Sequence, residues 1–290
     1  MKMALDPTPF HRTHSLLQFP QLAAELGYPY LQLTPHPDFL PFFTHPKADD
    51  ALTAALKKAC AEAEVGIASI LPVLRWSSPD ENLRQAAVRY WRRAVQLAVD
   101  LGVSQMNTEF GGRPEHPEES EAAFYQSMEE LVPLFEREGI QVAIDPHPDD
   151  FVEEGLAAWR VIRGANSPNL GFVYVAAHAF HLADSPDRIL QEVGERLQVV
   201  HVADTMDHRA SNGLRYITNP PGNPVRVHQH LKIGDGDVDW QQLFEALAQN
   251  GFLDRTETVM VSSVFAENEN AAEVARYQLA TMTDLVNGIR

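Results

Sequence analysis

Several residue types are scarce in this 290-residue chain, and each scarcity excludes a class of protein. A single cysteine, Cys60, cannot form an internal disulfide, which suits a reducing compartment. Lysine and arginine number 23 against 40 aspartates and glutamates, and a formal net charge of −17 opposes binding to nucleic acid or to an anionic membrane. No apolar run is long enough to span a membrane, and the N-terminal stretch lacks a signal-peptide pattern. We therefore expect a cytoplasmic protein that binds neither nucleic acid nor membranes.

Short apolar runs typical of strands alternate with amphipathic stretches typical of helices. We predict strands at residues 3–5, 30–33, 66–73, 103–109, 140–145, 171–176, 197–203 and 258–262. We predict helices at residues 16–26, 50–63, 82–101, 118–138, 154–163, 185–193, 240–250 and 269–286. Glycines that commonly end helices follow four of these patterns, at Gly27, Gly102, Gly139 and Gly251.

This alternation predicts an α/β fold, a single-domain (β/α)8 TIM barrel over residues 1–290. A two-domain doubly wound fold is the main rival, but no Gly-x-Gly-x-x-Gly follows the first predicted strand. The pattern is interrupted at about residues 205–238, which contain the Pro-rich sequence ITNPPGNP. We interpret this segment as an insertion that covers the active site, because long loops of compact domains usually serve function.

Acidic and imidazole side chains stand where successive predicted strands end. Because such ends meet on one rim of a barrel, these groups are expected to lie close together. Carboxylates and imidazoles on one rim suggest a divalent metal site. The residues concerned are Glu109, Asp145, His147, His178, His201 and His230.

The spacing of these residues refines the expectation. Asp145 and His147 are two apart on an extended segment, so their side chains point the same way. His201 lies inside an apolar strand and needs a partner, either a metal or Asp204. His228 and His230 repeat the two-residue spacing before the turn IGDGDVDW. We interpret that turn as structural, because it lacks the lysine of a phosphate-binding loop.

Other residues near the rim are candidates for binding substrate. His36 follows the second predicted strand, and Arg75 with Trp76 follows the third, where hydrogen bonds and stacking could hold a polar ring. The remaining candidates lie in or near the insertion: Arg215, Tyr216, His228 and Lys232.

With these motifs, the chain resembles the xylose-isomerase-like barrel superfamily, which includes sugar-phosphate isomerases and epimerases, inosose isomerases and dehydratases, ketose 3-epimerases, and endonuclease IV. The resemblance is carried mainly by VVHVAD and by HQHLKIGDGDVDW, in which His230 matches the His of a His-x-x-Ile-Gly-x-Gly turn. It implies a (β/α)8 barrel with a divalent metal at the carboxyl ends of the strands. His201 matches the metal-binding histidine of strand seven, and His178 matches the histidine of an Asp-x-x-His motif.

The chain also departs from the family's pattern. Asp145 stands at the usual glutamate of strand five, Val175 at the aspartate of strand six, and Ser262 or Ser263 at the glutamate of strand eight. We therefore expect a remodelled site rich in nitrogen ligands, which favours Mn, Zn or Co over Mg. We assign the metal to Glu109, His147, His178 and His230, and the acid/base chemistry to Glu109, Asp145 and His201.

The resemblance implies a metal-dependent isomerase or epimerase that acts on a keto-sugar or keto-inositol through an enediolate. A dehydratase or lyase on a 3-keto sugar or inosose shares the same first step and stays an alternative. A phosphodiesterase like endonuclease IV is disfavoured by the acidity of the chain. A barrel that has lost catalysis is a further alternative. The partners we expect are a small sugar or cyclitol and, as an open question, further copies of the chain in a homo-oligomer.

Overall fold

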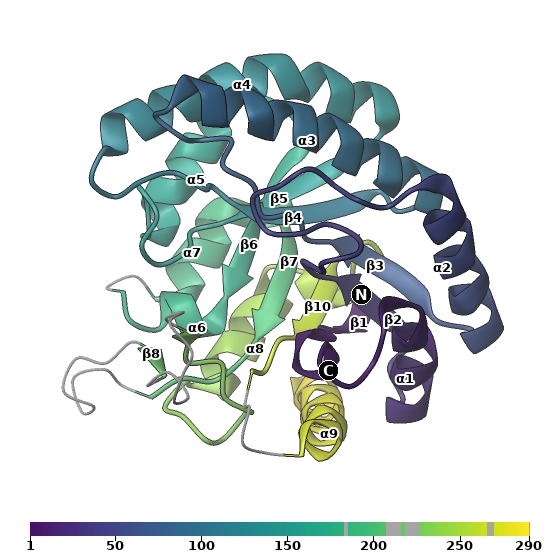
Figure 1. The fold of residues 1–290 in the computed structure, drawn as a ribbon. Coiled ribbons are helices and arrows are strands. Elements are labelled where there is room, and N and C mark those ends of the chain that lie inside the picture. The colour runs from purple at the N-terminus through teal and green to yellow at the C-terminus, as the bar shows by residue number, and fades with distance from the viewer. Residues whose placement is uncertain (183–184, 207–215, 218–226, 266–269, 290) are drawn as a thin grey trace.

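The computed structural model describes residues 1–182, 185–206, 216–217, 227–265 and 270–289, with only the backbone described at 216–217 and 227–228. Parallel strands close into a barrel in the order β1-β10-β7-β6-β5-β4-β3-β2, with helices around it (Figure 1). These strands are β1 (Lys2–Leu5), β2 (Tyr30–Leu33), β3 (Gly66–Ile70), β4 (Gln105–Glu109), β5 (Gln141–Asp145), β6 (Leu170–Val175), β7 (Leu197–Val202) and β10 (Val259–Ser262). Each predicted strand overlaps one of them, which confirms the predicted (β/α)8 barrel.

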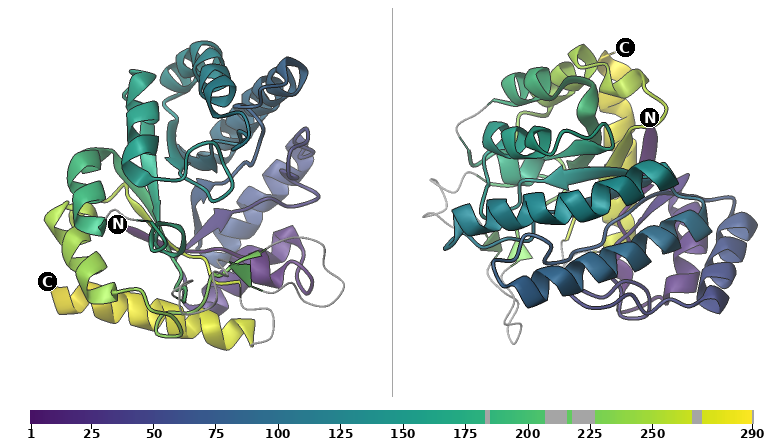
Figure 2. Two further views of the ribbon diagram at one scale, coloured as in Figure 1. Left: turned by 90° about the vertical axis from the view of Figure 1, so that its left-hand side faces the viewer. Right: turned by 90° about the horizontal axis from the view of Figure 1, so that it is seen from above.

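Helices cover the outside of the barrel (Figure 2). They are α1 (Phe19–Leu26), α2 (Asp50–Ala63), α3 (Glu81–Leu101), α4 (Pro117–Glu138), α5 (Gly155–Gly164), α6 (Ala176–Ala179), α7 (Pro186–Val193), α8 (Trp240–Gln249) and α9 (Ala271–Ile289). Local sequence sets their ends: the side chains of Asp49 and Asp80 accept backbone N–H groups in the first turns of α2 and α3. The predicted stops have a positive φ, at Gly27, Gly102, Gly139 and Gly251.

The core has two layers that follow the alternation of side chains along each strand. On β6, Phe172 and Tyr174 belong to the larger cluster, which joins the strands to the surrounding helices. Val173 and Val175 belong to a second cluster of small side chains, contributed by several strands, that fills the barrel interior. The barrel is therefore a packed support that fixes the ends of its strands.

Asp204, just after β7, organises the turn IGDGDVDW. Its carboxylate accepts the backbone N–H groups of Gly234 and Val238 and the indole N–H of Trp240, at 2.8, 3.1 and 2.9 Å. A Cβ at Gly236 would collide with this carboxylate, so only glycine allows the turn to approach so closely. The turn is structural, as the sequence suggests.

The insertion is closed at its base by two backbone hydrogen bonds. Asp204 and Leu231 each donate to the other's carbonyl oxygen at 2.8 Å. Within the insertion, β8 (Tyr216–Ile217) pairs with β9 (Val227–His228) in antiparallel fashion. The two ends of the insertion are thus joined directly to the end of β7.

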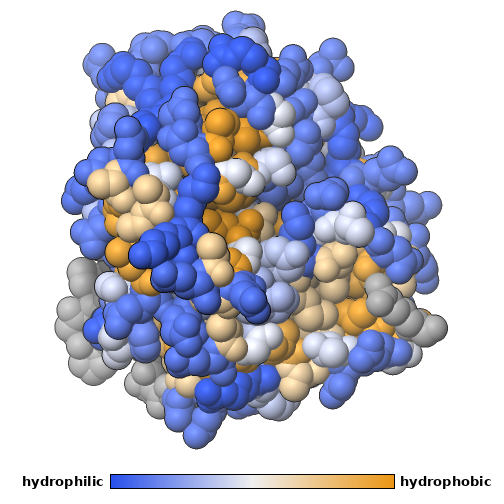
Figure 3. Space-filling view, turned by 90° about the vertical axis from the view of Figure 1, so that its right-hand side faces the viewer, coloured by the Kyte–Doolittle hydropathy of each residue, from blue (hydrophilic) through white to orange (hydrophobic). Residues whose placement is uncertain are grey.

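The surface is mixed in character. Viewed from the right-hand side of Figure 1, hydrophobic side chains occupy the middle of the face and hydrophilic ones surround them (Figure 3). Throughout the part of the chain that the structure describes, the helices are too short or too polar to cross a membrane.

Candidate active site

The carboxyl end of the barrel brings most of the predicted site residues together. Glu109 and Asp145 are the last residues of β4 and β5, and they are direct neighbours in the parallel ladder. His147 follows β5, and His178 lies in the one-turn helix α6 directly after β6. His230 comes from the far end of the insertion. Four elements therefore supply one cluster, which we call the rim cluster.

Contacts link the members of the rim cluster in a chain. The Nε2 atom of His147 lies 3.6 Å from Oε1 of Glu109. The rings of His147 and His178 meet edge to face, with centroids 4.9 Å apart. Nδ1 of His178 lies 3.4 Å from Oδ2 of Asp145, and its Nε2 lies 3.2 Å from Nε2 of His230. The sequence prediction that these residues converge agrees with this geometry.

The hydrogen bonds fix the state of the His230 ring. Its Nδ1–H donates to the carbonyl oxygen of Ser263 at 2.7 Å, and its ring stacks on Phe265 at 4.5 Å. Burial lowers the pKa of His230 to about 4, so the ring is neutral at neutral pH. The Nε2 atom of His230 therefore presents a lone pair towards His178.

Burial and neighbouring charges shift the pKa values of Asp145 and His147. Burial, together with the nearby Glu109 and Asp150, raises the pKa of Asp145 to about 8, although His147 opposes the shift. Burial alone would lower the pKa of His147, but Glu109 and Asp145 outweigh it and raise that pKa. Both shifts mean that the rim cluster favours an added positive charge, either a proton or a cation.

The nitrogen pair of His178 and His230 fits two adjacent positions around a metal ion. Ligand nitrogens of tetrahedral zinc, at about 2.0 to 2.1 Å from the ion, lie about 3.3 Å apart. Asp145 stands behind His178, where carboxylates commonly orient metal-binding imidazoles. Among the described residues, however, no three His, Cys, Asp or Glu side chains are placed to hold a metal ion together. Within the described part of the chain, the spacing of this pair is thus compatible with two ligand positions and no more.

His201 lies apart from this chain of contacts. It is buried in β7, and its Nε2 atom accepts from the amide of Asn107 on β4 at 3.4 Å. Burial, with a smaller effect of His230, lowers the pKa of His201 to about 3. In the structure its hydrogen-bond partner is Asn107, whereas the carboxylate of Asp204 accepts hydrogen bonds from the turn. A ring so hard to protonate is a poor acid at neutral pH.

Arg75 is the candidate for substrate binding that lies beside the rim cluster. It follows β3 and is half-buried, and the carboxylates of Glu109 and Asp150 interact with its charge. His36 is buried after β2, where its Nδ1 accepts the backbone N–H of Asp38 and its ring packs edge-on against His11. No contact between His36 and the rim cluster is found in the described part of the chain.

Of two other candidates for substrate binding, Trp76 requires correction and Lys232 stays a prediction. Trp76 is completely buried and stacks on Trp91 at 4.4 Å, so it belongs to the core and cannot contact a substrate. Lys232 forms an ion pair with Asp235 at 2.6 Å and lies near the ring of Tyr277 on α9. These partners hold its ammonium group against α9. Arg215 lies outside the described residues, as do the side chains of Tyr216 and His228.

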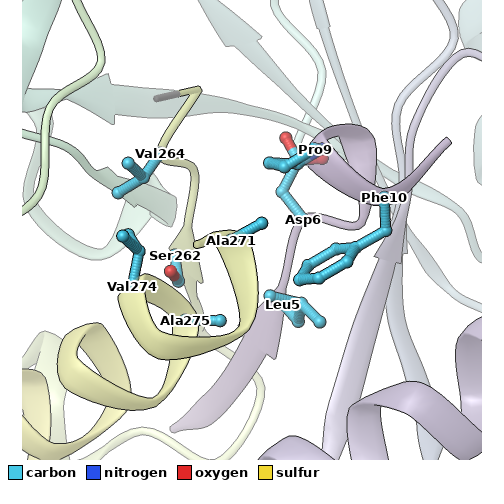
Figure 4. Close-up of a pocket in the computed structure, with 9 residues that line it drawn as sticks. All are labelled: Leu5, Asp6, Pro9, Phe10, Ser262, Val264, Ala271, Val274 and Ala275. Atoms are coloured by element: carbon cyan, nitrogen blue, oxygen red, sulfur yellow. The ribbon is translucent and has the colours of Figure 1, made fainter. Parts of the chain in front are cut away.

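The sequence prediction missed two buried carboxylates at the same end of the barrel. Asp6 directly follows β1 and lines a small cavity with Ser262 of β10 (Figure 4). The first apolar run ends in a carboxylate just as later runs do, so the same signal was present. Asp150 accepts the backbone N–H groups of Gly111 and Gly112 at 2.7 and 2.9 Å. It therefore fastens the loop after Glu109 to the loop that carries His147.

Comparison with known structures shows that the fold is shared with several enzymes. D-psicose 3-epimerase with D-tagatose, from Clostridium cellulolyticum, superposes with a TM-score of 0.76 at 14% identity, over 99% of both chains. The IOLI protein with a bound zinc atom gives 0.71 at 17% identity, over 100% of this chain and 99% of that one. A probable 3-DHS dehydratase from Bacillus anthracis gives 0.70 at 14% identity, over 98% and 99%. At these identities the likeness shows the fold alone.

Sequence comparison identifies the family. An uncharacterized protein from Methanocaldococcus jannaschii is 23% identical over 201 residues, which span 66% of this chain and 62% of that relative. The family model of the xylose isomerase-like TIM barrel matches residues 20–285. The match covers nearly the whole barrel, and the resemblance drawn from the sequence motifs is confirmed. The chain belongs to the xylose isomerase-like TIM barrel family.

Proposed function

We propose that this protein is a metal-dependent isomerase or epimerase that acts on a keto-sugar or keto-cyclitol through an enediolate. The observation that carries the proposal is the continuous chain of contacts from Glu109 through His147 and His178 to His230. These contacts bring a carboxylate and three imidazoles close together at one mouth of the barrel, which supports the proposal. Enzymes with this fold include an epimerase described with D-tagatose and a protein described with zinc, which supports the choice.

The mechanism follows from the positions of these side chains. The chemistry that a divalent ion at His178 and His230 supplies is Lewis acidity, which weakens the C–H bond beside the substrate carbonyl. Glu109 is partly exposed at the rim and removes that proton as the base. His147 faces Glu109 through Nε2 and returns a proton to the enediolate, at the neighbouring carbon or on the other face. Asp145 orients His178.

Replacement of Glu109 by glutamine tests the proposal. Exchange of the substrate's α-hydrogen with deuterium oxide is followed by NMR for D-fructose and scyllo-inosose, and bound metal is measured by elemental analysis. We expect Glu109→Gln to lower the exchange rate about 100-fold or more, because general base catalysis contributes on that order. Glu118→Gln, on the exposed start of α4, is the matched control and should exchange like the unmodified protein.

Two outcomes contradict the proposal. If Glu109→Gln changes neither exchange nor metal content, Glu109 does not have the proposed role. If the unmodified, metal-loaded protein exchanges hydrogen on neither probe, the isomerase assignment fails.

A dehydratase is the second candidate, favoured by the shared fold of the probable 3-DHS dehydratase. Abstraction of the same proton would then be followed by loss of a hydroxyl group from the next carbon. Mass spectrometry of the products distinguishes the two reactions, since isomerisation conserves mass and elimination releases water.

A further inference from the structure

Arg75 stands at the mouth of the barrel against the loop that carries Glu109. A Cβ at Gly111 would collide with the carbonyl oxygen of Leu74 and contact Cα of Arg75, so the β4–α4 loop lies directly on the backbone of Arg75. The glycine at position 111 permits this approach and has a φ of 68°. Arg75 is therefore fixed next to the proposed base.

The guanidinium group of Arg75 is held by an aromatic ring. Its central carbon lies 4.0 Å above the ring centre of Phe43, a distance typical of stacking. Phe43 has a φ of 57°, which is unfavourable for a bulky residue, and its backbone N–H donates to the carbonyl oxygen of Val73. Strained residues of this kind cluster at ligand sites. The strained backbone thus places a ring over one face of the guanidinium and leaves its in-plane N–H groups uncovered.

No oxygen among the described residues accepts a hydrogen bond from the Arg75 guanidinium or pairs with it within 4.0 Å. The two nearby carboxylates are engaged elsewhere. The two oxygens of the Asp150 carboxylate accept hydrogen bonds from the backbone N–H groups of Gly111 and Gly112. The carboxylate of Glu109 faces His147. Arg113 adds a second positive charge close enough to interact with Arg75. Among the described residues, the five donors of this half-buried guanidinium thus have no acceptor beside the proposed base.

We propose that Arg75, assisted by Arg113, binds an oxyanion of the substrate, a carboxylate or a phosphate, while Glu109 acts on the carbon beside the carbonyl. The planar fork of arginine matches paired anionic oxygens, whereas a neutral hydroxyl satisfies a single N–H and leaves the charge unpaired. The inference rests on the proposed function and narrows its substrates to acidic keto-sugars or keto-cyclitols.

Three ligands that differ in one group test this inference. D-fructose, D-fructuronate and D-fructose 6-phosphate share a ketose and carry a hydroxymethyl, a carboxylate or a phosphate group at the last carbon. Their dissociation constants are measured by calorimetry on the metal-loaded protein. We expect at least one acid to bind about tenfold or more tightly than D-fructose, since a charged bidentate pair is worth that much. The stronger of the two acids identifies the oxyanion.

Variants of Arg75 test whether the preference for the acidic ligand depends on this side chain. We expect Arg75→Gln to reduce the preference for the acid over D-fructose to about twofold or less. Arg75→Lys keeps the charge without the fork and should be intermediate. Arg89→Gln, on the exposed face of α3, should behave like the unmodified protein. Thermal unfolding of each variant verifies that it is folded.

The inference is overturned if the acids bind no better than D-fructose, if their preference survives in Arg75→Gln, or if none of the three ligands binds. Because binding is measured without turnover, the two proposals fail separately. If the protein binds the acid through Arg75 but does not exchange hydrogen, the oxyanion site is supported and the isomerase assignment fails.

Discussion

His178 and His230 face each other through their Nε2 atoms at 3.2 Å, while the Nδ1 atoms of the two rings are directed at Asp145 and the carbonyl oxygen of Ser263. When the Nδ1 atoms of both neutral rings carry the proton, their Nε2 lone pairs face each other, an arrangement that a shared proton or a metal ion stabilises. The relationship joins residues from α6 and from the end of the insertion.

Replacement of His230 by glutamine should abolish tight zinc binding, because it removes one nitrogen of the pair. Zinc affinity is measured by calorimetry on protein from which bound metal has been removed with a chelator. His116→Gln, an exposed histidine at the start of α4, is the control and should bind zinc normally. Equal zinc affinity in His230→Gln and the unmodified protein would contradict the assignment.

Asp150 should stabilise the loop after Glu109. Asp150→Ala leaves the N–H groups of Gly111 and Gly112 without their acceptor, which we expect to cost about 3 kcal/mol of unfolding free energy. Hydrogen exchange at these two amides should accelerate more than elsewhere. The exposed Asp284→Ala provides the comparison. Unchanged protection of the two amides would show that the hydrogen bonds to Asp150 do not stabilise this loop.

Trp76 should contribute to stability rather than to binding. Its ring is completely buried against Trp91, so Trp76→Ala should lower the unfolding free energy by about 3 to 5 kcal/mol, measured by urea denaturation. Leu83 is exposed on α3, the helix that carries Trp91, so Leu83→Ala should lower the unfolding free energy far less. A folded Trp76→Phe variant should bind D-fructose as tightly as the unmodified protein. Weaker binding in that variant would indicate that Trp76 contacts the substrate after all.

Asp6 should make the protein less stable as pH rises. Burial raises the pKa of Asp6 from 3.8 to about 6, so the folded state binds more protons than the unfolded state between these values. The resulting stabilisation is present in full below about pH 4 and is lost as pH rises through about 6. Asp6→Asn can still accept the N–H of Thr8 and removes the titration.

The size of this effect follows from the shift of about 2 pKa units, which corresponds to about 3 kcal/mol. Urea unfolding at about pH 4 and about pH 8 should show a smaller loss of stability for Asp6→Asn than for the unmodified protein, by roughly that amount. Asp284→Asn is the matched control at the surface. Equal losses in both variants would exclude Asp6 as the cause.

The sequence predicts the barrel well because its signals are local and repeated. The helix at residues 50–63 is predicted at its observed ends, where Asp49 caps the first turn, and the strand at 30–33 is likewise matched. The strand-end pattern also predicts the convergence of Glu109, Asp145 and His147, because parallel strands end on one rim.

The sequence fails where a side chain's direction depends on tertiary packing. Arg75 and Trp76 are adjacent after β3, yet one lies beside Glu109 and the other stacks in the core. The partner of His201 is another case. Asp204 is close in sequence, but the distant Asn107 meets the ring, because neighbouring positions across the barrel interior are not neighbours in the chain. Such choices require the three-dimensional arrangement of the strands.

The paired hydrogen bonds between Asp204 and Leu231 have an evolutionary consequence. They join the two ends of the stretch that they enclose, and His230, the residue before Leu231, is held by a separate contact with the carbonyl oxygen of Ser263. Residues earlier in the stretch can therefore vary in length and composition while both anchors of this histidine stay in place.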